Sequence, residues 1–205
     1  MTAPIAMPAI PFPLHASDDR LWTIGADDVT VTAAPHSDLF ADPSGGGQTA
    51  AESQMNAATL LGEPPAGDFT FSARVRVGFA STFDAGVLLV WIDEHYWAKL
   101  CFELSPDREP MVVSVVTRGV SDDANAFVVT GEDVHLRVSR IGRVFAFHAS
   151  SGDGRWVFVR AFSLPGAESA RVGFEAQSPM GDGCEVAFSD VDFSQRTLGN
   201  LRDGS

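Results

Sequence analysis

The most regular pattern in the chain is the strict alternation of apolar and polar residues over residues 69–79. Phe71 and Val75 share one parity, whereas Arg74 has the other. Successive side chains of a strand point to opposite faces, so this segment is predicted to be a strand with one buried and one solvated face. Phe71 and Val75 are therefore expected in the core, and Arg74 is expected at the surface.

Further strands are indicated where short segments rich in Val and Phe lie between Gly, Pro and Asp turns. Residues 85–91 are apolar at both parities, which is typical of a central strand covered on both faces. The other predicted strands cover residues 96–104, 111–118, 134–139, 144–149, 156–163, 170–177 and 184–193. This regular spacing predicts an all-β protein in which two antiparallel sheets pack as a sandwich.

Two segments do not follow the strand pattern. Residues 49–61 are the only weak helix candidate, and Asn56 and Thr59 disfavour a helix there, so we expect a loop with at most one helical turn. The glycine run 45–47 is too short to separate two domains. Without an internal repeat, the chain is predicted to be a single β-sandwich domain over residues 1–205, ordered over about residues 12–195.

The charge of the chain limits the classes of partner. It contains 27 Asp and Glu against 14 Lys and Arg, which gives a formal net charge of −13 at pH 7. Because a nucleic-acid-binding protein needs a basic face for the phosphate backbone, no nucleic-acid partner is expected. Hydrophobic residues at 45% and charged residues at 20% are typical of a folded globular chain.

The first residues and the apolar runs favour a cytoplasmic location. Residues 1–19 contain four prolines and no Lys or Arg, unlike a secretory signal. No apolar run approaches the ~20 residues of a membrane-spanning helix, so no membrane association is expected. Cys101 and Cys184 are far apart in the sequence, and we expect two free thiols. A single disulfide is the alternative if the protein is exported.

Several short motifs resemble a known family. They are HSDLF at 36–40, GDFTF at 67–71, DAGV at 84–87, YWAK at 96–99 and VVTR at 115–118, followed by RVFAF at 143–147 and FSDVDF at 188–193. The first five are similar to the regulator-of-enolase-like proteins, a family of largely unknown activity. The last two resemble the concanavalin A-like lectin/glucanase superfamily. The resemblance implies a jelly roll of two antiparallel sheets, one of them concave, and suggests a carbohydrate ligand without implying an established reaction.

The first candidate site residues lie on the predicted strand 96–104. Period-two geometry places Trp97, Lys99 and Glu103 on one face. On an open concave sheet, Trp97 could stack on a sugar ring, and Lys99 could donate hydrogen bonds to its hydroxyl groups. The alternative is a surface pair between Lys99 and Glu103 beside a half-buried Trp97.

Three residues of other predicted strands are further ligand-binding candidates. Arg118 ends its strand, so its guanidinium could reach the same groove, with a salt bridge to Asp122 or Asp123 as the alternative. Glu175 and Gln177 share one strand face, which is either part of that groove or a solvated outer face.

Catalysis is a second hypothesis. Glycoside hydrolysis needs two carboxyl groups about 5–9.5 Å apart. Catalytic relatives in the superfamily carry alternating acids of the type Glu-x-Asp-x-(x)-Glu on one strand, and residues 97–103 depart from that pattern. Glu103 and Glu175 are the candidate acid/base residues, with Lys99 or Arg118 as electrostatic stabiliser.

The histidines show no metal-binding spacing, and no phosphate-binding glycine motif follows a predicted strand. We therefore expect no metal and no cofactor, with a calcium ion held by Asp182, Asp190 or backbone carbonyls as the alternative. Our first hypothesis for function is a non-catalytic carbohydrate-binding or regulatory protein. The alternatives are a carbohydrate-active enzyme, hydrolase or lyase, and a protein-interaction module.

Overall fold

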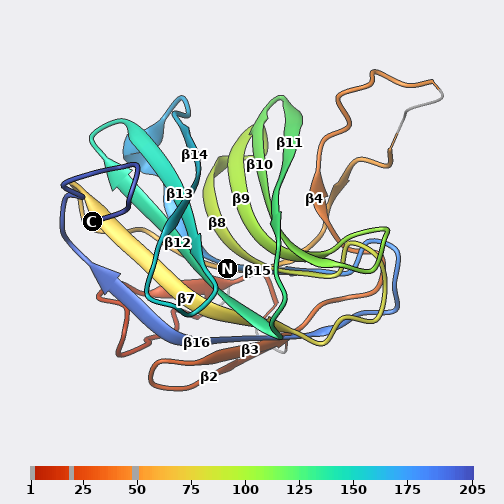
Figure 1. The fold of residues 1–205 in the computed structure, drawn as a ribbon, viewed down its shortest axis with the longest axis horizontal. Helices are drawn as coiled ribbons and strands as arrows, with labels where there is room; N and C mark the ends of the chain where they lie inside the picture. Colours follow the sequence, from red (N-terminus) through yellow and green to blue (C-terminus); the bar gives the residue numbers. More distant parts are fainter. Residues whose placement is uncertain (1–2, 19–20, 48–50) are drawn as a thin grey trace.

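The chain forms two seven-stranded antiparallel sheets (Figure 1). The computed structural model describes residues 3–18, 21–47 and 51–205. Sheet A contains, in spatial order, β1 (Leu14–Ala16), β6 (Ala58–Gly62), β15 (Arg171–Gln177), β8 (Ala85–Asp93), β9 (Tyr96–Leu104), β10 (Pro110–Arg118) and β11 (Val120–Val128). Sheet B contains β14 (Val157–Phe162), β13 (Val144–Ser150), β12 (Asp133–Ile141), β7 (Phe69–Val77), β16 (Glu185–Ser194), β3 (Val29–Thr32) and β2 (Trp22–Ile24).

Three short elements are also present in the described part of the chain. β4 (Leu39–Phe40) and β5 (Gln54–Met55) pair with each other, and η2 (Ala167–Ser169) is a single turn of 3-10 helix. The expected all-β sandwich is thus confirmed, while the single-domain organisation stays a prediction. Among the described residues, no helix is long and apolar enough to cross a membrane.

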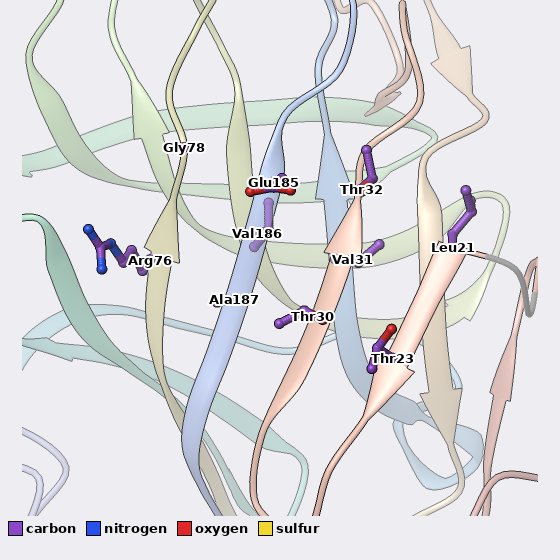
Figure 2. Close-up of a pocket in the computed structure, with 10 residues that line it drawn as sticks. All are labelled: Leu21, Thr23, Thr30, Val31, Thr32, Arg76, Gly78, Glu185, Val186 and Ala187. Carbon is purple, nitrogen blue, oxygen red and sulfur yellow. The ribbon is translucent and has the colours of Figure 1, made fainter.

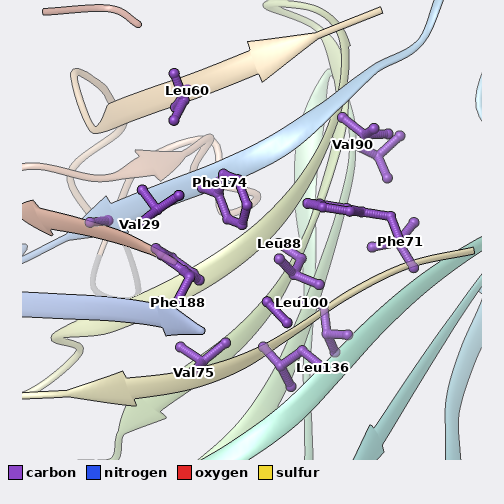
Figure 3. Packing of buried hydrophobic residues seen from close by; sticks show 14 of the residues in the cluster. Val29, Leu60, Phe71, Val75, Leu88, Val90, Leu100, Leu136, Phe174 and Phe188 are labelled. Atoms are coloured by element: carbon purple, nitrogen blue, oxygen red, sulfur yellow. The ribbon is translucent and has the colours of Figure 1, made fainter. Parts of the chain in front are cut away.

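The main core lies between the two sheets and follows from the alternation in the sequence. Phe71 and Val75 of β7 are fully buried, whereas Arg74 is exposed, as predicted. Figure 3 shows Phe71 of sheet B beside Phe174 of sheet A, with ring centroids 5.3 Å apart in an edge-to-face contact. Burying a side chain of this size contributes about 1.5–3 kcal/mol to stability.

The expectation of a loop over residues 49–61 is wrong where the structure describes that segment. Thr49 and Ala50 lie outside the described residues, but the rest contains β5 and β6. β6 pairs with β1 on one side and β15 on the other, and it buries Leu60 and Leu61. Pairing with two strands and burial outweigh the weak local propensity of this segment.

β11 is a second element that the sequence pattern did not reveal. It is the last strand of sheet A, and most of its side chains are exposed, including Asp122 and Asp123. An edge strand with polar side chains lacks the apolar alternation that marks buried strands, and the acids protect its free edge from pairing with other chains.

Part of the outer face of sheet A, which points away from sheet B, is covered by a segment that comprises residues 38–40 and 51–57. Strands β8 to β11 curve around the side on which β4 lies (Figure 1). Leu39 and Ala57 of the covering segment pack against Leu89, Trp97 and Val115 in a second apolar cluster. This segment therefore closes part of the outer face and forms the wall of the cavity described next.

Candidate functional site

A cavity of about 240 Å³ lies on the outer face of sheet A, and we call it the outer-face pocket. The covering segment forms one side of it, and a turn at residues 179–180 forms another. Its lining combines acidic, amide and apolar side chains: Asp38, Phe40, Ala51, Glu52, Gln54, Phe83, Lys99, Glu103, Val115, Asp123, Gln177, Pro179 and Met180. Small-molecule sites commonly combine apolar surface with a few polar groups in this way.

The strand register explains why these side chains converge. Glu103 of β9 and Gln177 of β15 are both paired with Ala85 of β8, which lies between them. The register therefore places Glu103 and Gln177 on either side of Ala85, on the same face of the sheet.

Lys99 is the most buried charged group of the pocket wall. Its side chain is only 2% exposed, and its Nζ donates hydrogen bonds of 2.8 Å to Asp38 Oδ1 and to Gln177 Oε1. Burial by itself lowers the pKa of Lys99, but the negative charges of Asp38 and Glu175 raise it above its ordinary value overall. Lys99 is therefore an ammonium ion at neutral pH, with Asp38 as its counter-ion.

Three carboxyl groups near Lys99 hold their protons unusually strongly. Burial raises the pKa of Glu103 to about 8 and that of Glu175 to about 8, although Lys99 opposes both shifts. Burial also raises the pKa of Asp123. A carboxyl group protonated at neutral pH can donate as well as accept a hydrogen bond. Glu103, which is half-buried in the pocket wall, can thus act as a neutral hydrogen-bond donor or as a general acid.

Glu175 and Gln177 lie on the same face of β15 as predicted, and both are buried. The alternative of a solvated outer face is therefore wrong. Gln177 lines the pocket, and its Nε2 also donates to the Phe83 carbonyl at 3.2 Å. Glu175 is 0% exposed, and neither of its carboxyl oxygens has a hydrogen-bond partner.

Trp97 does not form the open stacking surface that the sequence suggested. It lies on the expected face but is 0% exposed, because Leu39, Ala57 and Leu61 cover it. Its Nε1 is buried without a hydrogen-bond partner. Trp97 is instead a core residue of the second apolar cluster. The alternative of a half-buried Trp97 is also wrong, because the side chain is completely buried.

Arg118 lies away from the pocket, contrary to expectation. It pairs with Tyr96 at the end of β9 opposite to Glu103. Its Nη2 donates to the Ser163 carbonyl at 2.8 Å, while Asp122 forms its ion pair with Arg160 at 2.9 Å instead. Arg118 therefore neither lines the groove nor forms the expected salt bridge with Asp122 or Asp123.

Some residues that line the pocket were not predicted from the sequence. Asp38 replaces Glu103 as the partner of Lys99, and the HSDLF motif that contains it was the available signal. Phe40 and Phe83 provide the aromatic surface that Trp97 was expected to offer. Cys101 and Cys184 are free thiols, as predicted, and both are buried.

A larger cavity of about 580 Å³ lies on the outer face of sheet B (Figure 2). Thr23, Thr30 and Thr32 line it together with Arg76, whose guanidinium pairs with Glu132 at 2.9 Å. Its polar side chains are exposed, as on an ordinary solvated sheet face. Within the described ranges, no group of three or more His, Cys, Asp or Glu side chains could hold a metal ion.

The two curved, antiparallel layers define a β-sandwich of the concanavalin A-like jelly-roll class. The chain belongs to the family described as "Protein of unknown function (DUF1349)", whose model matches residues 17–196. It is 33% identical over 132 residues to "Regulation of enolase protein 1" of Saccharomyces cerevisiae, an alignment that spans 64% of this chain and 66% of that protein. The resemblance inferred from the motifs is thereby confirmed.

Solved structures show the same fold. A functionally unknown protein from Saccharomyces cerevisiae superposes with a TM-score of 0.78 at 26% identity, covering 91% of this chain and 97% of that one. A xylan beta-1,4-xylosidase from Bacillus halodurans C-125 has a TM-score of 0.66 at 12% identity and 87% coverage of this chain, which corresponds to 35% of the xylosidase. An alginate lyase from Klebsiella pneumoniae has a TM-score of 0.55 at 13% identity, with coverages of 86% and 85%.

Proposed function

We propose that this protein binds a small carbohydrate in the outer-face pocket and acts as a carbohydrate-binding, regulatory module. One observation carries the proposal: hydrogen-bonding side chains and accessible aromatic rings line the same cavity. Sugar rings present apolar faces and hydroxyl edges, so they are recognised by aromatic surface combined with a few polar groups.

The dimensions of the pocket favour a ligand of about one sugar unit. Its volume of about 240 Å³ is smaller than that of typical ligand sites, which occupy about 300–1,000 Å³. Gln177, Glu103 and Asp123 provide donors and acceptors along its wall. Longer chains would have to extend past the exposed Met180, which lies at the rim.

Phe83 is the residue that we assign to ring stacking. It is 37% exposed and has a φ of 67°, a backbone conformation that is costly for a bulky residue. Hydrogen bonds from Gln177 to its carbonyl and from its own N–H to the Leu104 carbonyl hold it in place. Strain of this kind is often stored at binding sites, where it fixes a side chain before the ligand arrives.

The relatives support the two parts of the proposal. Two structural neighbours are named for their carbohydrates, a xylan beta-1,4-xylosidase and an alginate lyase. The regulatory part takes its support from the name of the relative "Regulation of enolase protein 1". The cytoplasmic location stays a prediction, and docking of a partner protein on this face is the competing interpretation.

A carbohydrate-active enzyme is a second candidate, favoured by the raised pKa of Glu103. A general acid needs a pKa near the working pH, and a value of about 8 satisfies this condition. Glu103→Gln separates the two functions. In a binding module it should change the affinity only a few-fold, whereas in a hydrolase it should abolish the release of reducing sugar and leave the ligand bound.

The proposal can be tested by titrating isotope-labelled protein with a panel of monosaccharides and following amide NMR shifts. We expect saturable shifts around the pocket and a loss of most affinity in Phe83→Ala. Phe158→Ala removes a half-buried phenylalanine from sheet B and is the matched control. If the folded parent binds none of the sugars, or if both variants lose binding equally, the proposal is wrong.

A further inference from the structure

Acidic side chains outnumber basic ones in the wall of the outer-face pocket. Asp38, Glu52, Glu103 and Asp123 line it, and Lys99 is the single basic side chain among its described lining residues. The segment that supplies Glu52 and the edge strand that supplies Asp123 both leave these residues exposed. A ligand that enters the pocket therefore meets carboxyl groups from several sides.

Lys99 cannot compensate for this excess, because its charge is already engaged. Its Nζ donates to Asp38 Oδ1 and to Gln177 Oε1, both at 2.8 Å, and its side chain is 2% exposed. The positive charge of Lys99 and the negative charge of Asp38 cancel each other in this ion pair. Glu52 and Asp123 are then left without a basic partner among the described lining residues, and Glu103, whose pKa is raised to about 8, is neutral at pH 6.

A further carboxyl group lies on the same face of the sheet and is neutral at pH 6, because burial raises its pKa to about 8. Glu175 lies on the face of β15 that Gln177 shares, two positions earlier, and is completely buried. Both of its oxygens lack a hydrogen-bond partner. A buried carboxyl group without partners is costly as an anion, and a cation placed nearby would stabilise it.

The acidic groups also act on one another. Burial is the largest cause of the raised pKa of Glu103, and the charges of Asp123, Asp38 and Glu175 raise it further. Charges of one sign in a partly closed, low-dielectric cavity create a potential that attracts ions of the opposite sign and repels ions of the same sign.

We infer that the outer-face pocket prefers a sugar or similar polyol that carries an ammonium group, accepts neutral sugars more weakly, and excludes acidic sugars. This inference rests on the proposed function and specifies its ligand class. The ammonium group donates to the carboxylates of Glu52 and Asp123, while the hydroxyl groups bond to Gln177 and Glu103. A uronate carboxylate would instead face these acids without a free cation in the described wall.

Three probes with the same ring and different charges test this preference: glucosamine, glucose and glucuronate. Affinities are measured at pH 6 by NMR titration of the full chain, in low salt and again in 0.5 M NaCl. We expect glucosamine to bind about tenfold more tightly than glucose at low salt, and glucuronate not to bind detectably. Salt should remove much of the glucosamine advantage and leave glucose unchanged.

Charge-removing variants show which groups are responsible. Asp123→Asn and Glu52→Gln affect exposed side chains, so the fold should survive, and each should lower glucosamine affinity several-fold more than it lowers glucose affinity. Glu168→Gln, an exposed acid in η2, makes the same change in net charge and should have no effect.

The outcomes separate this inference from the proposed function. If glucose binds in the pocket as tightly as glucosamine, or if glucuronate binds best, the charge preference is wrong and carbohydrate binding stands. The same conclusion follows if Glu168→Gln weakens glucosamine as much as Asp123→Asn does. If none of the three sugars binds to the folded protein, the proposed function fails, and this inference fails with it.

Discussion

Each sheet buries a basic side chain on its outer face, Lys99 on sheet A and Arg137 on sheet B, and both residues are 2% exposed. Lys99 is bonded to the carboxylate of Asp38. Arg137 instead donates to the Gly204 carbonyl at 2.7 Å and stacks on Trp156, with its guanidinium carbon 4.2 Å from the ring centroid. One cation thus has a counter-ion, whereas the other is held by a carbonyl dipole and an aromatic face.

The segments that cover the two outer faces also differ, in whether they leave a cavity beside the buried cation. On sheet B, residues 198–205 lie over Arg137 and His148, whose Nε2 donates to the Leu201 carbonyl at 2.8 Å. Burial lowers the pKa of Arg137 to about 10, with Arg196 contributing, and leaves its Nε unbonded. On sheet A, the cover leaves a cavity beside a matched ion pair. The cover on sheet B fills the space above its cation, whereas the cover on sheet A frames the cavity that we propose as a binding site.

Truncating the tryptophan of each face should have the largest effect. Trp97→Ala removes a ring that is completely buried among apolar side chains and should cost about 3–5 kcal/mol of unfolding free energy. Trp156→Ala removes a half-buried ring and should cost only about 1–2 kcal/mol. Urea denaturation measures both. Equal losses would mean that the two covers are equally important for stability.

Removing the two buried cations should reveal the difference in their partners. Lys99→Met leaves Asp38 without its counter-ion beside other acidic side chains. It should cost about 3–5 kcal/mol of unfolding free energy, as expected when one partner of a buried ion pair is lost. Arg137→Met loses one hydrogen bond and a stacking contact but also relieves an unpaired charge, so the cost should stay below about 1.5 kcal/mol. Thermal and urea unfolding at pH 7 test the ranking, and a reversed order would contradict the assignment of counter-ions.

The two faces should respond to pH in opposite directions. Because the pKa of Glu175 is raised from 4.5 to about 8, the folded state holds more protons between these values, and its contribution to stability falls as the pH rises. Burial lowers the pKa of His148 below 6.5, so its contribution is present above that pH and is lost as the pH falls.

Stability measured from pH 4 to pH 9 checks both signs. Glu175→Gln should reduce the fall on the alkaline side, and His148→Gln should reduce the fall on the acidic side. A Glu175→Gln profile that runs parallel to that of the parent would show that this carboxyl group is not held protonated.

A small effect is also expected at Gly204, where the cover of sheet B meets Arg137. Gly204 has a φ of 73°, and a Cβ atom added there would contact Arg137 Nη2. Gly204→Ala should therefore cost about 1–2 kcal/mol. It should leave sugar binding in the outer-face pocket unchanged, and NMR titration of the variant would show whether the two faces are independent.

The shared face of Lys99, Glu103 and Gln177 was predictable, because alternation along β9 and β15 decides which side chains share a face. The burial of Trp97 was not, since alternation says nothing about what covers a face. Arg118 was misplaced for a related reason. Lys99 pairs with Val115, so the pocket face of β10 carries the odd-numbered residues, and this register appears only in the folded sheet.

The sequence by itself determined the all-β class, most of the strands and the core face of β7. These features depend on local alternation and on turn chemistry, which residues close in the chain specify together. Only the tertiary structure decided that Asp38 reaches Lys99 across 61 positions of the chain, that Leu39 closes over Trp97, and that a cavity remains beside them. Such contacts arise from strand order and from the packing of distant segments, neither of which leaves a periodic signal in the sequence.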